Sequence, residues 1–117
     1  MDRACSPLVH ALHPSPNFEP RRGKSRADML VLHYTGMMSA PRAIAWLAEP
    51  ASRVSCHYVI DEAGLITQMV AESERAWHAG VGSWAGETDI NSASIGIEIQ
   101  NPGHDLGYPD FPEVQMK

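Results

Sequence analysis

The sequence is poor in cysteine and has no long apolar run. Its two cysteines, Cys5 and Cys56, are too few for a disulfide framework and lack zinc-knuckle spacing, so free thiols in a reducing compartment are the simplest interpretation. No apolar run approaches the roughly 18–20 residues of a membrane-spanning helix. No apolar segment of the kind found in signal peptides follows Arg3. We therefore expect no membrane span and a cytoplasmic location, with a periplasmic or cell-wall-facing setting as the alternative.

Positive charge is also scarce. Nine Lys and Arg residues stand against fourteen Asp and Glu, which gives a formal net charge of −5. Because nucleic-acid-binding chains neutralise phosphates with clustered Lys and Arg, we expect no nucleic-acid partner. Hydrophobic residues make up 44% and charged residues 20% of the 117 positions, which is typical of one globular domain.

The first half of the chain predicts a lead-in followed by a strand and a helix. Residues 1–28 carry four of the nine prolines and predict an irregular segment before a domain at 29–117. The apolar run 29–35 predicts a strand buried on both faces. Ser39, followed by Pro41, predicts the start of a helix that ends at Glu49–Pro50.

The second half predicts a hairpin, a loop and a further strand. Residues 57–60 and 65–69 flank a four-residue turn. Residues 80–94 show no periodicity, which indicates a functional loop. Residues 95–100 alternate, so their isoleucines should face one side and Glu98 the other. The stretch 110–117 predicts the first turn of a helix, so we expect a domain that is incomplete at its C-terminus. Together these elements predict an α/β fold with a mixed central sheet flanked by helices.

Two residues on the predicted strands could carry chemistry. His33 ends an otherwise apolar strand, where it is either a hydrogen-bonded core histidine or a metal ligand or general base at a sheet edge. Glu98 is either exposed to solvent or placed in a cleft, because an unpaired buried carboxylate is costly. Gly96 leaves space beside that carboxylate, which favours a site. Cys56 and His57 are strand neighbours that point to opposite faces, so they cannot form a catalytic dyad.

Four motifs together resemble one family. They are Leu-His-Tyr-Thr at 32–35, Ser-x-His-Tyr-Val-Ile at 55–60, Ala-Trp-His-Ala-Gly at 76–80 and Asn-x-x-Ser-Ile-Gly-Ile-Glu at 91–98. In this order they resemble the zinc-dependent N-acetylmuramoyl-L-alanine amidases, whose fold is shared with the peptidoglycan recognition proteins. The resemblance runs from about residue 29 to residue 116.

The resemblance implies a role for five residues. His33 matches the first zinc ligand and Glu98 the catalytic glutamate, while Tyr34, Trp77 and His78 match substrate-binding positions. His57 matches a histidine that is not a ligand. The remaining zinc ligands and a catalytic lysine are expected beyond Lys117, so we expect the 117 residues alone to be inactive. The implied cofactor is Zn²⁺, and the implied partners are peptidoglycan fragments, or muropeptides.

Two functions remain open from the sequence. The first is hydrolysis of the amide bond between N-acetylmuramic acid and L-alanine, with zinc-activated water and Glu98 as general base and acid. The second is a catalytically silent peptidoglycan-binding module that keeps the cleft without a full zinc site. A hydrolase that uses Cys56 is a weaker third hypothesis, because no triad accompanies it.

Overall fold

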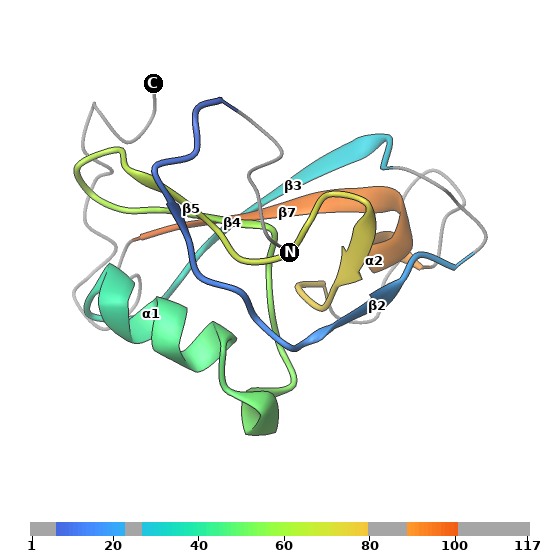
Figure 1. Cartoon of the computed structure of the whole chain (residues 1–117), viewed down its shortest axis with the longest axis horizontal. Coiled ribbons are helices and arrows are strands. Elements are labelled where there is room, and N and C mark those ends of the chain that lie inside the picture. The colour runs from blue at the N-terminus through green and yellow to red at the C-terminus, as the bar shows by residue number, and fades with distance from the viewer. Residues whose placement is uncertain (1–6, 23–26, 80–88, 101–117) are drawn as a thin grey trace.

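A computed structural model describes residues 7–22, 27–79 and 89–100 (Figure 1). The elements are, in chain order, β1 (Ala11–Leu12), β2 (Phe18–Pro20), β3 (Met29–Tyr34), α1 (Ala40–Leu47), a 3₁₀ turn (Pro50–Ser52), β4 (Tyr58–Ile60), β5 (Ile66–Gln68), β6 (Glu74–Ala76), α2 (Ile90–Ala93) and β7 (Ser94–Ile99). Neither of the α-helices in these ranges is long and apolar enough to cross a membrane.

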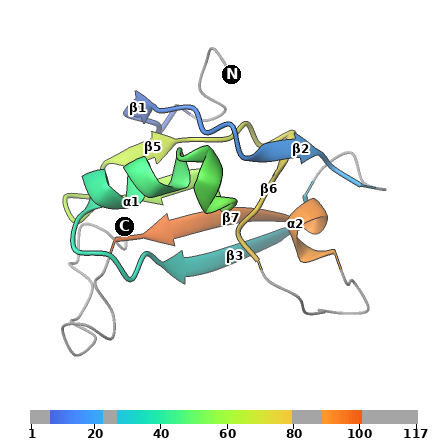
Figure 2. The same cartoon turned by 90° about the horizontal axis from the view of Figure 1, so that it is seen from below.

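A five-stranded mixed sheet organises the fold. Its order is β1-β5-β4-β7-β3, and β7 lies parallel to both β4 and β3, whereas β4 and β5 are antiparallel. A separate antiparallel pair joins β2 to β6. Helix α1 lies against one face of the sheet (Figure 2), where Leu47 packs with Cys56, Val59 and Met69. The predicted α/β class with a mixed central sheet is confirmed.

The predicted helix after Ser39 and the predicted hairpin are both confirmed, as α1 and as β4–β5. The Ser39 hydroxyl accepts a hydrogen bond from the Arg42 amide at 3.3 Å and caps α1, whose buried residues include Leu47. Helix α1 ends before Pro50, as expected of a residue that disfavours helical backbone before it. In the β4–β5 turn, the Asp61 carboxylate accepts hydrogen bonds from two backbone amides, and Gly64 adopts a φ of +84°.

The expectation of an irregular segment over residues 1–28 is wrong for two stretches. Strand β1 pairs with β5, and β2 pairs with β6. Strands β1 and β2 both lie at the edges of their sheets, where a short strand can pair despite neighbouring prolines. The division of the chain at residue 29 stays a prediction.

Arg21 fastens this segment to the rest of the fold. Its guanidinium donates hydrogen bonds of 2.7–3.2 Å to backbone carbonyl oxygens in the turn before β6 and in the α2–β7 region, at Glu72, Asn91, Ser92 and Ser94. One side chain therefore ties three segments together.

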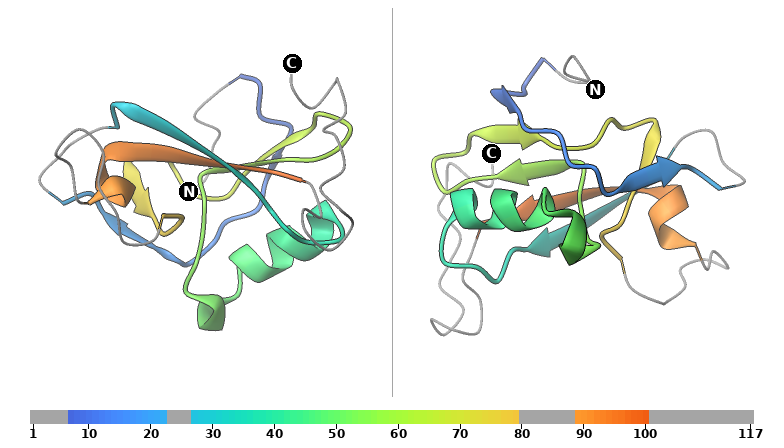
Figure 3. Two further views of the ribbon diagram at one scale, coloured as in Figure 1. Left: turned by 180° about the vertical axis from the view of Figure 1, so that it is seen from behind. Right: turned by 60° about the horizontal axis from the view of Figure 1, so that its bottom comes forward.

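The expectation that residues 29–35 are buried on both faces is also wrong. In β3, half-buried residues alternate with Leu30, Leu32 and Tyr34, which are 69%, 60% and 47% exposed. Strand β3 is the last in the sheet order, and among the described elements α1 covers the opposite face (Figure 3).

The aperiodic stretch expected at 80–94 is shorter than predicted. Residues 90–93 form α2, capped by the Asp89 carboxylate, which accepts from the Ser92 amide at 3.3 Å, and Ser94 already begins β7. The rest of that stretch (80–88), the helix expected at 110–117, and His104 lie outside the described residues.

Candidate functional site

His33 and Glu98 lie side by side on one face of the sheet. Strands β3 and β7 run parallel, and their register pairs His33 directly with Glu98. Glu98 is also paired with Val59 of β4, which packs in the core beneath α1, so both site residues face α1. Two residues 65 positions apart in the chain are thus brought together by strand pairing alone.

The Glu98 carboxylate is half-buried and incompletely satisfied. Its Oε2 atom is shielded from solvent and has no hydrogen-bond partner in the described part of the chain. Burial raises the pKa of Glu98 to about 7, because desolvation disfavours the charged form. A carboxyl group with this pKa can both take up and release a proton at neutral pH.

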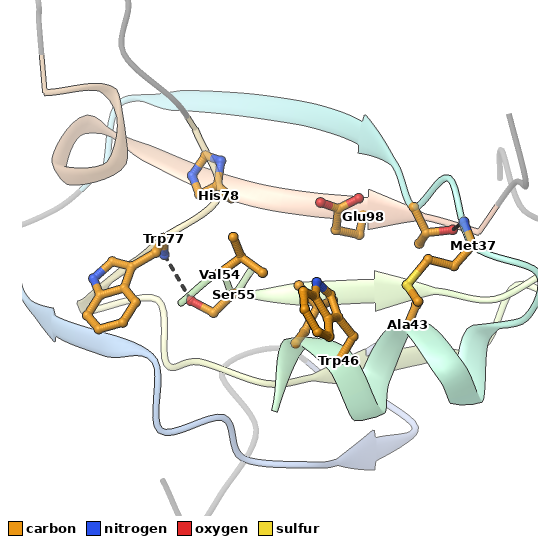
Figure 4. Close-up of a pocket in the computed structure, with 10 residues that line it drawn as sticks. Met37, Ala43, Trp46, Val54, Ser55, Trp77, His78 and Glu98 are labelled. Atoms are coloured by element: carbon orange, nitrogen blue, oxygen red, sulfur yellow. Dashed lines mark hydrogen bonds between the residues drawn. The ribbon is translucent and has the colours of Figure 1, made fainter. Parts of the chain in front are cut away.

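The pocket beside Glu98 lies between β7 and α1 (Figure 4). It measures about 160 Å³, below the roughly 300–1,000 Å³ of pockets that enclose a whole small ligand. Its apolar wall comes from α1 and nearby loops. Its polar groups come mainly from the sheet and from the residues that follow β6. Its lining residues are Thr35, Met37, Ala43, Trp46, Leu47, Val54, Ser55, Trp77, His78 and Glu98. A larger ligand would therefore extend beyond this pocket.

Trp77 lines the same pocket. Its backbone amide donates to the Ser55 hydroxyl at 2.9 Å, and Ser55 in turn donates its amide to the Trp77 carbonyl at 2.8 Å. This reciprocal pair fixes the segment after β6 against the segment before β4. The contact of Trp77 with substrate stays a prediction.

His78 contacts His33 and is held in place by two further residues. Its Nδ1 atom lies 3.1 Å from His33 Nε2, and its Nε2 atom lies 2.9 Å from the Ser94 hydroxyl oxygen. Its backbone amide donates to the Asn91 side chain at 3.1 Å. Burial, together with the neighbouring His33 and other cationic groups, lowers the pKa of His78 to about 3, so the ring is neutral at pH 7. Burial also lowers the pKa of His33.

Gly96 is required by the His78 ring. A Cβ atom at Gly96 would lie 2.4 Å from two ring carbons of His78. The sequence indicated free space beside Glu98 at this position. The structure fills that space with the imidazole, so the glycine serves His78 rather than an open cleft.

His57 is a hydrogen-bonded core histidine, as expected. It is fully buried, its Nδ1 atom accepts from the Gly96 amide at 3.0 Å, and its Nε2 atom lies 2.9 Å from the Glu74 carbonyl oxygen. Since a carbonyl only accepts, Nε2 carries the proton. Burial lowers the pKa of His57 to about 4, and both ring nitrogens are engaged by backbone groups. These contacts leave no nitrogen for a metal.

Cys56 does not form a nucleophilic site. It is fully buried, its thiol donates to the Tyr58 carbonyl at 3.3 Å, and burial raises the pKa of the thiol. Reactive cysteines have the opposite properties, namely solvent access and a lowered pKa. The hypothesis of a Cys56 hydrolase is therefore not supported.

Tyr34 is the predicted site residue that the structure places elsewhere. It follows His33 directly in β3, and neighbouring residues of a strand point to opposite faces. Its side chain therefore lies on the face away from α1 and does not line the pocket beside Glu98. A substrate contact of Tyr34 in this pocket is not supported.

Sequence reasoning missed Trp46 and Ser94. Trp46 is half-exposed on the pocket wall, three residues after buried Ala43 in α1. Helical spacing could have placed it beside the apolar stripe of Ala43 and Leu47. Ser94 shares a strand face with Gly96 and Glu98, but its link to His78 depends on a tertiary contact that no spacing shows.

Comparison with known proteins finds one family. The family described as N-acetylmuramoyl-L-alanine amidase matches residues 23–117. A 1,6-anhydro-N-acetylmuramyl-L-alanine amidase, AmpD, of Salmonella typhimurium is 36% identical over 121 aligned positions that cover 88% of this chain and 64% of the relative. The chain thus spans less than two thirds of the length of this curated relative.

Solved structures of the same family share the fold. A selenomethionine derivative of AmpD superimposes with a TM-score of 0.78 at 29% identity, covering 94% of this chain and 68% of that one. The amidase AmiD of E. coli, in complex with the substrate anhydro-N-acetylmuramic acid-L-Ala-D-gamma-Glu-L-Lys, superimposes with a TM-score of 0.68 at 33% identity. That match covers 84% of this chain and 40% of AmiD.

Proposed function

Because the chain belongs to the N-acetylmuramoyl-L-alanine amidase family, we propose that the protein hydrolyses the amide bond between N-acetylmuramic acid and L-alanine in muropeptides. The observation that carries this proposal is the pairing of His33 with the half-buried Glu98, which lines a pocket. The AmiD structure supports the substrate class, since its ligand contains this bond in an anhydro-N-acetylmuramyl peptide.

Glu98 is proposed as the group that moves the proton. At neutral pH about half of these carboxyl groups are ionised, because burial raises the pKa to about 7. The carboxylate would take a proton from the attacking water as the carbon–oxygen bond forms. It would then donate the proton to the alanine nitrogen as the carbon–nitrogen bond breaks. Oε2 has no protein partner in the described residues, so it is the oxygen best placed to receive this proton.

His33 is proposed as one ligand of a zinc ion. Zinc, when bound, supplies an acidified water and polarises the scissile carbonyl. The donor chemistry fits, since burial lowers the pKa of the His33 imidazole and His33 is paired across the strands with Glu98, whose Oε2 atom has no hydrogen-bond partner in the described residues. Within the described ranges, no three His, Cys, Asp or Glu residues are grouped closely enough to hold a metal. The other protein ligands are therefore expected outside the described residues.

The test is a paired measurement on the purified full-length form of the protein. Zinc content is measured by mass spectrometry, and release of the stem peptide from an N-acetylmuramyl-L-alanyl peptide is followed by chromatography. We expect turnover with zinc and its loss after chelation. Binding of the peptide without turnover in the zinc-loaded protein would instead support the silent binding module. If the protein shows no turnover and no binding of the peptide, both functions are contradicted. The cytoplasmic location stays a prediction that fractionation of cells can test.

A further inference from the structure

A chain of hydrogen bonds runs from His33 through His78 and Ser94 to the backbone of α2. His33 Nε2 lies 3.1 Å from His78 Nδ1, and His78 Nε2 lies 2.9 Å from the Ser94 hydroxyl oxygen. The Ser94 hydroxyl lies 2.7 Å from the Ile90 carbonyl oxygen. The proposed catalytic step does not use His78 or Ser94, although both are buried or half-buried beside the pocket.

The donor in each of these hydrogen bonds follows from the last acceptor, the Ile90 carbonyl oxygen. A backbone carbonyl can only accept, so the Ser94 hydroxyl donates its single proton to Ile90. The Ser94 oxygen must then accept from His78, which places the proton of the neutral His78 ring on Nε2. His78 Nδ1 consequently has a lone pair, and His33 must donate to it from Nε2. His33 is thereby left with its lone pair on Nδ1.

We infer that His78 and Ser94 are positioning residues that hold His33 as the Nε2–H tautomer and leave Nδ1 as its metal-binding nitrogen. This inference rests on the proposed function, because it takes His33 to be a zinc ligand. A histidine ligand commonly donates its other ring N–H to an acceptor, which fixes the tautomer and the orientation of the ring. Here the acceptor is a second imidazole.

Two features hold His78, the acceptor, in place. The His78 ring occupies the space that a side chain at position 96 would fill, with 2.4 Å between a Cβ there and the ring. The Asn91 carboxamide oxygen accepts from the amides of His78 and Ala79 at 3.1 and 2.8 Å. In the described ranges His33 Nε2 contacts His78, and no hydrogen bond reaches His33 Nδ1.

The first experiment reads the tautomers directly. Two-bond ¹H–¹⁵N correlation spectra of the histidine rings are recorded on uniformly labelled, metal-free protein near pH 7. We expect His33 and His78 each to show the Nε2–H tautomer. The exposed His13, replaced in H13Q, serves as an assignment control that leaves the other rings unchanged. A proton on Nδ1 of His33 would overturn the inference.

The second experiment removes the Ser94 hydroxyl, which lies at the far end of the hydrogen bonds that start at His33. Ser94→Ala removes one oxygen atom, so His78 loses its acceptor and His33 should become a mixture of tautomers. His78→Asn offers His33 a carboxamide oxygen instead and should restore the single tautomer. We expect zinc affinity to fall about 10- to 100-fold in Ser94→Ala and to fall less in His78→Asn. Amide spectra check that both variants are folded. If Ser94→Ala keeps the tautomer and the affinity of the wild type, the inference is wrong.

Zinc titration separates this inference from the proposed function. Zinc should shift the Nδ1 resonance of His33 far more than its Nε2 resonance. A shift centred on Nε2 would overturn the inference and leave the amidase proposal intact. A full-length wild-type protein that has the expected tautomers but binds no zinc would contradict the proposed zinc-dependent function. The hydrogen bonds between His33, His78 and Ser94 would then still stand.

Discussion

The two faces of strands β3 and β7 carry different kinds of side chain. On the face toward α1, β7 presents Ser94, Gly96 and Glu98, none of which is a hydrophobic side chain. On the opposite face, β7 presents its three isoleucines, beside the β3 residues Leu30, Leu32 and Tyr34. Within β7 the strand period of two separates the two sets completely. On β3 the side toward α1 carries Met29 and Val31 as well as His33.

In β7 both faces are largely buried, since Ile95 and Ile99 are 9% and 6% exposed, whereas in β3 the face away from α1 is open. A half-exposed strand normally turns its apolar side inward and its polar side to water. Here the polar side carries the half-buried Glu98 and supports the His78 ring, whereas the apolar side of β3 is largely open to solvent. Polar groups placed under a helix reduce stability unless they are satisfied, so their presence there indicates function rather than packing.

The largest expected effect is on catalysis, from Glu98→Gln in the full-length form of the protein. The amide keeps the size of the side chain but cannot accept a proton, so turnover should fall about 10²–10⁴-fold with zinc content near that of the wild type. Ile97→Val, on the opposite face of the same strand, is the matched control and should stay within a few-fold. The assay is muropeptide hydrolysis with parallel zinc analysis. Comparable losses in both variants would remove the distinction between the faces.

The next effect is on stability as a function of pH. The folded pKa of Glu98, about 7, lies above the ordinary value of 4.5, so the protonated form is the one that folding favours. That contribution is complete below about pH 4.5 and is lost as the pH rises through about 7. Relative to Glu98→Gln, the wild type should therefore lose about 3 kcal/mol of unfolding free energy between pH 4 and pH 8.

Urea unfolding of the two proteins at several pH values measures this difference. Comparing the two proteins cancels the histidines, whose lowered pKa values act in the opposite direction. A difference in unfolding free energy that does not change with pH would show that Glu98 is not held in a desolvated site.

A third, smaller effect concerns Gly96. Gly96→Ala places a methyl group against the His78 ring, and overpacking of this kind costs about 1–3 kcal/mol. The same substitution in a His78→Ala background should cost much less, because the ring is gone. A double-mutant cycle from thermal or urea unfolding measures the coupling. Equal costs in both backgrounds would mean that Gly96 is required for a reason other than the ring.

Local sequence signals predicted helix α1 and the β4–β5 hairpin, whereas the pairing of strands distant in the sequence depends on tertiary structure. Ser39 and Pro41 located the start of α1, and the turn at Asp61 and Gly64 located the hairpin, since each acts through its nearest neighbours. The motif resemblance named His33 and Glu98, and parallel pairing then placed them in register. No local signal predicted β1 or β2, because their partners lie more than 50 residues away along the chain.

The site residues that sequence reasoning missed share a cause. Ser94 and Trp46 both act through side chains that meet distant segments. Helical spacing indicates on which side of α1 Trp46 lies, but spacing along the chain does not show which distant segment either side chain meets. Tyr34 was placed in the site through its position in a motif, although strand alternation after His33 already sends it to the other face.

The smallest expected effect tests the apolar face itself. Leu32 is 60% exposed, so Leu32→Thr should change the unfolding free energy by no more than about 0.5 kcal/mol. Leu47→Ala, which truncates a buried leucine of the same type in α1, should cost about 2–5 kcal/mol. Exposed leucines on adjacent positions of one strand face also favour self-association, so Leu32→Thr should lower it in sedimentation experiments. A loss of several kcal/mol in Leu32→Thr would mean that this face is covered in the protein, and the contrast between the two faces would then be one of chemistry and not of exposure.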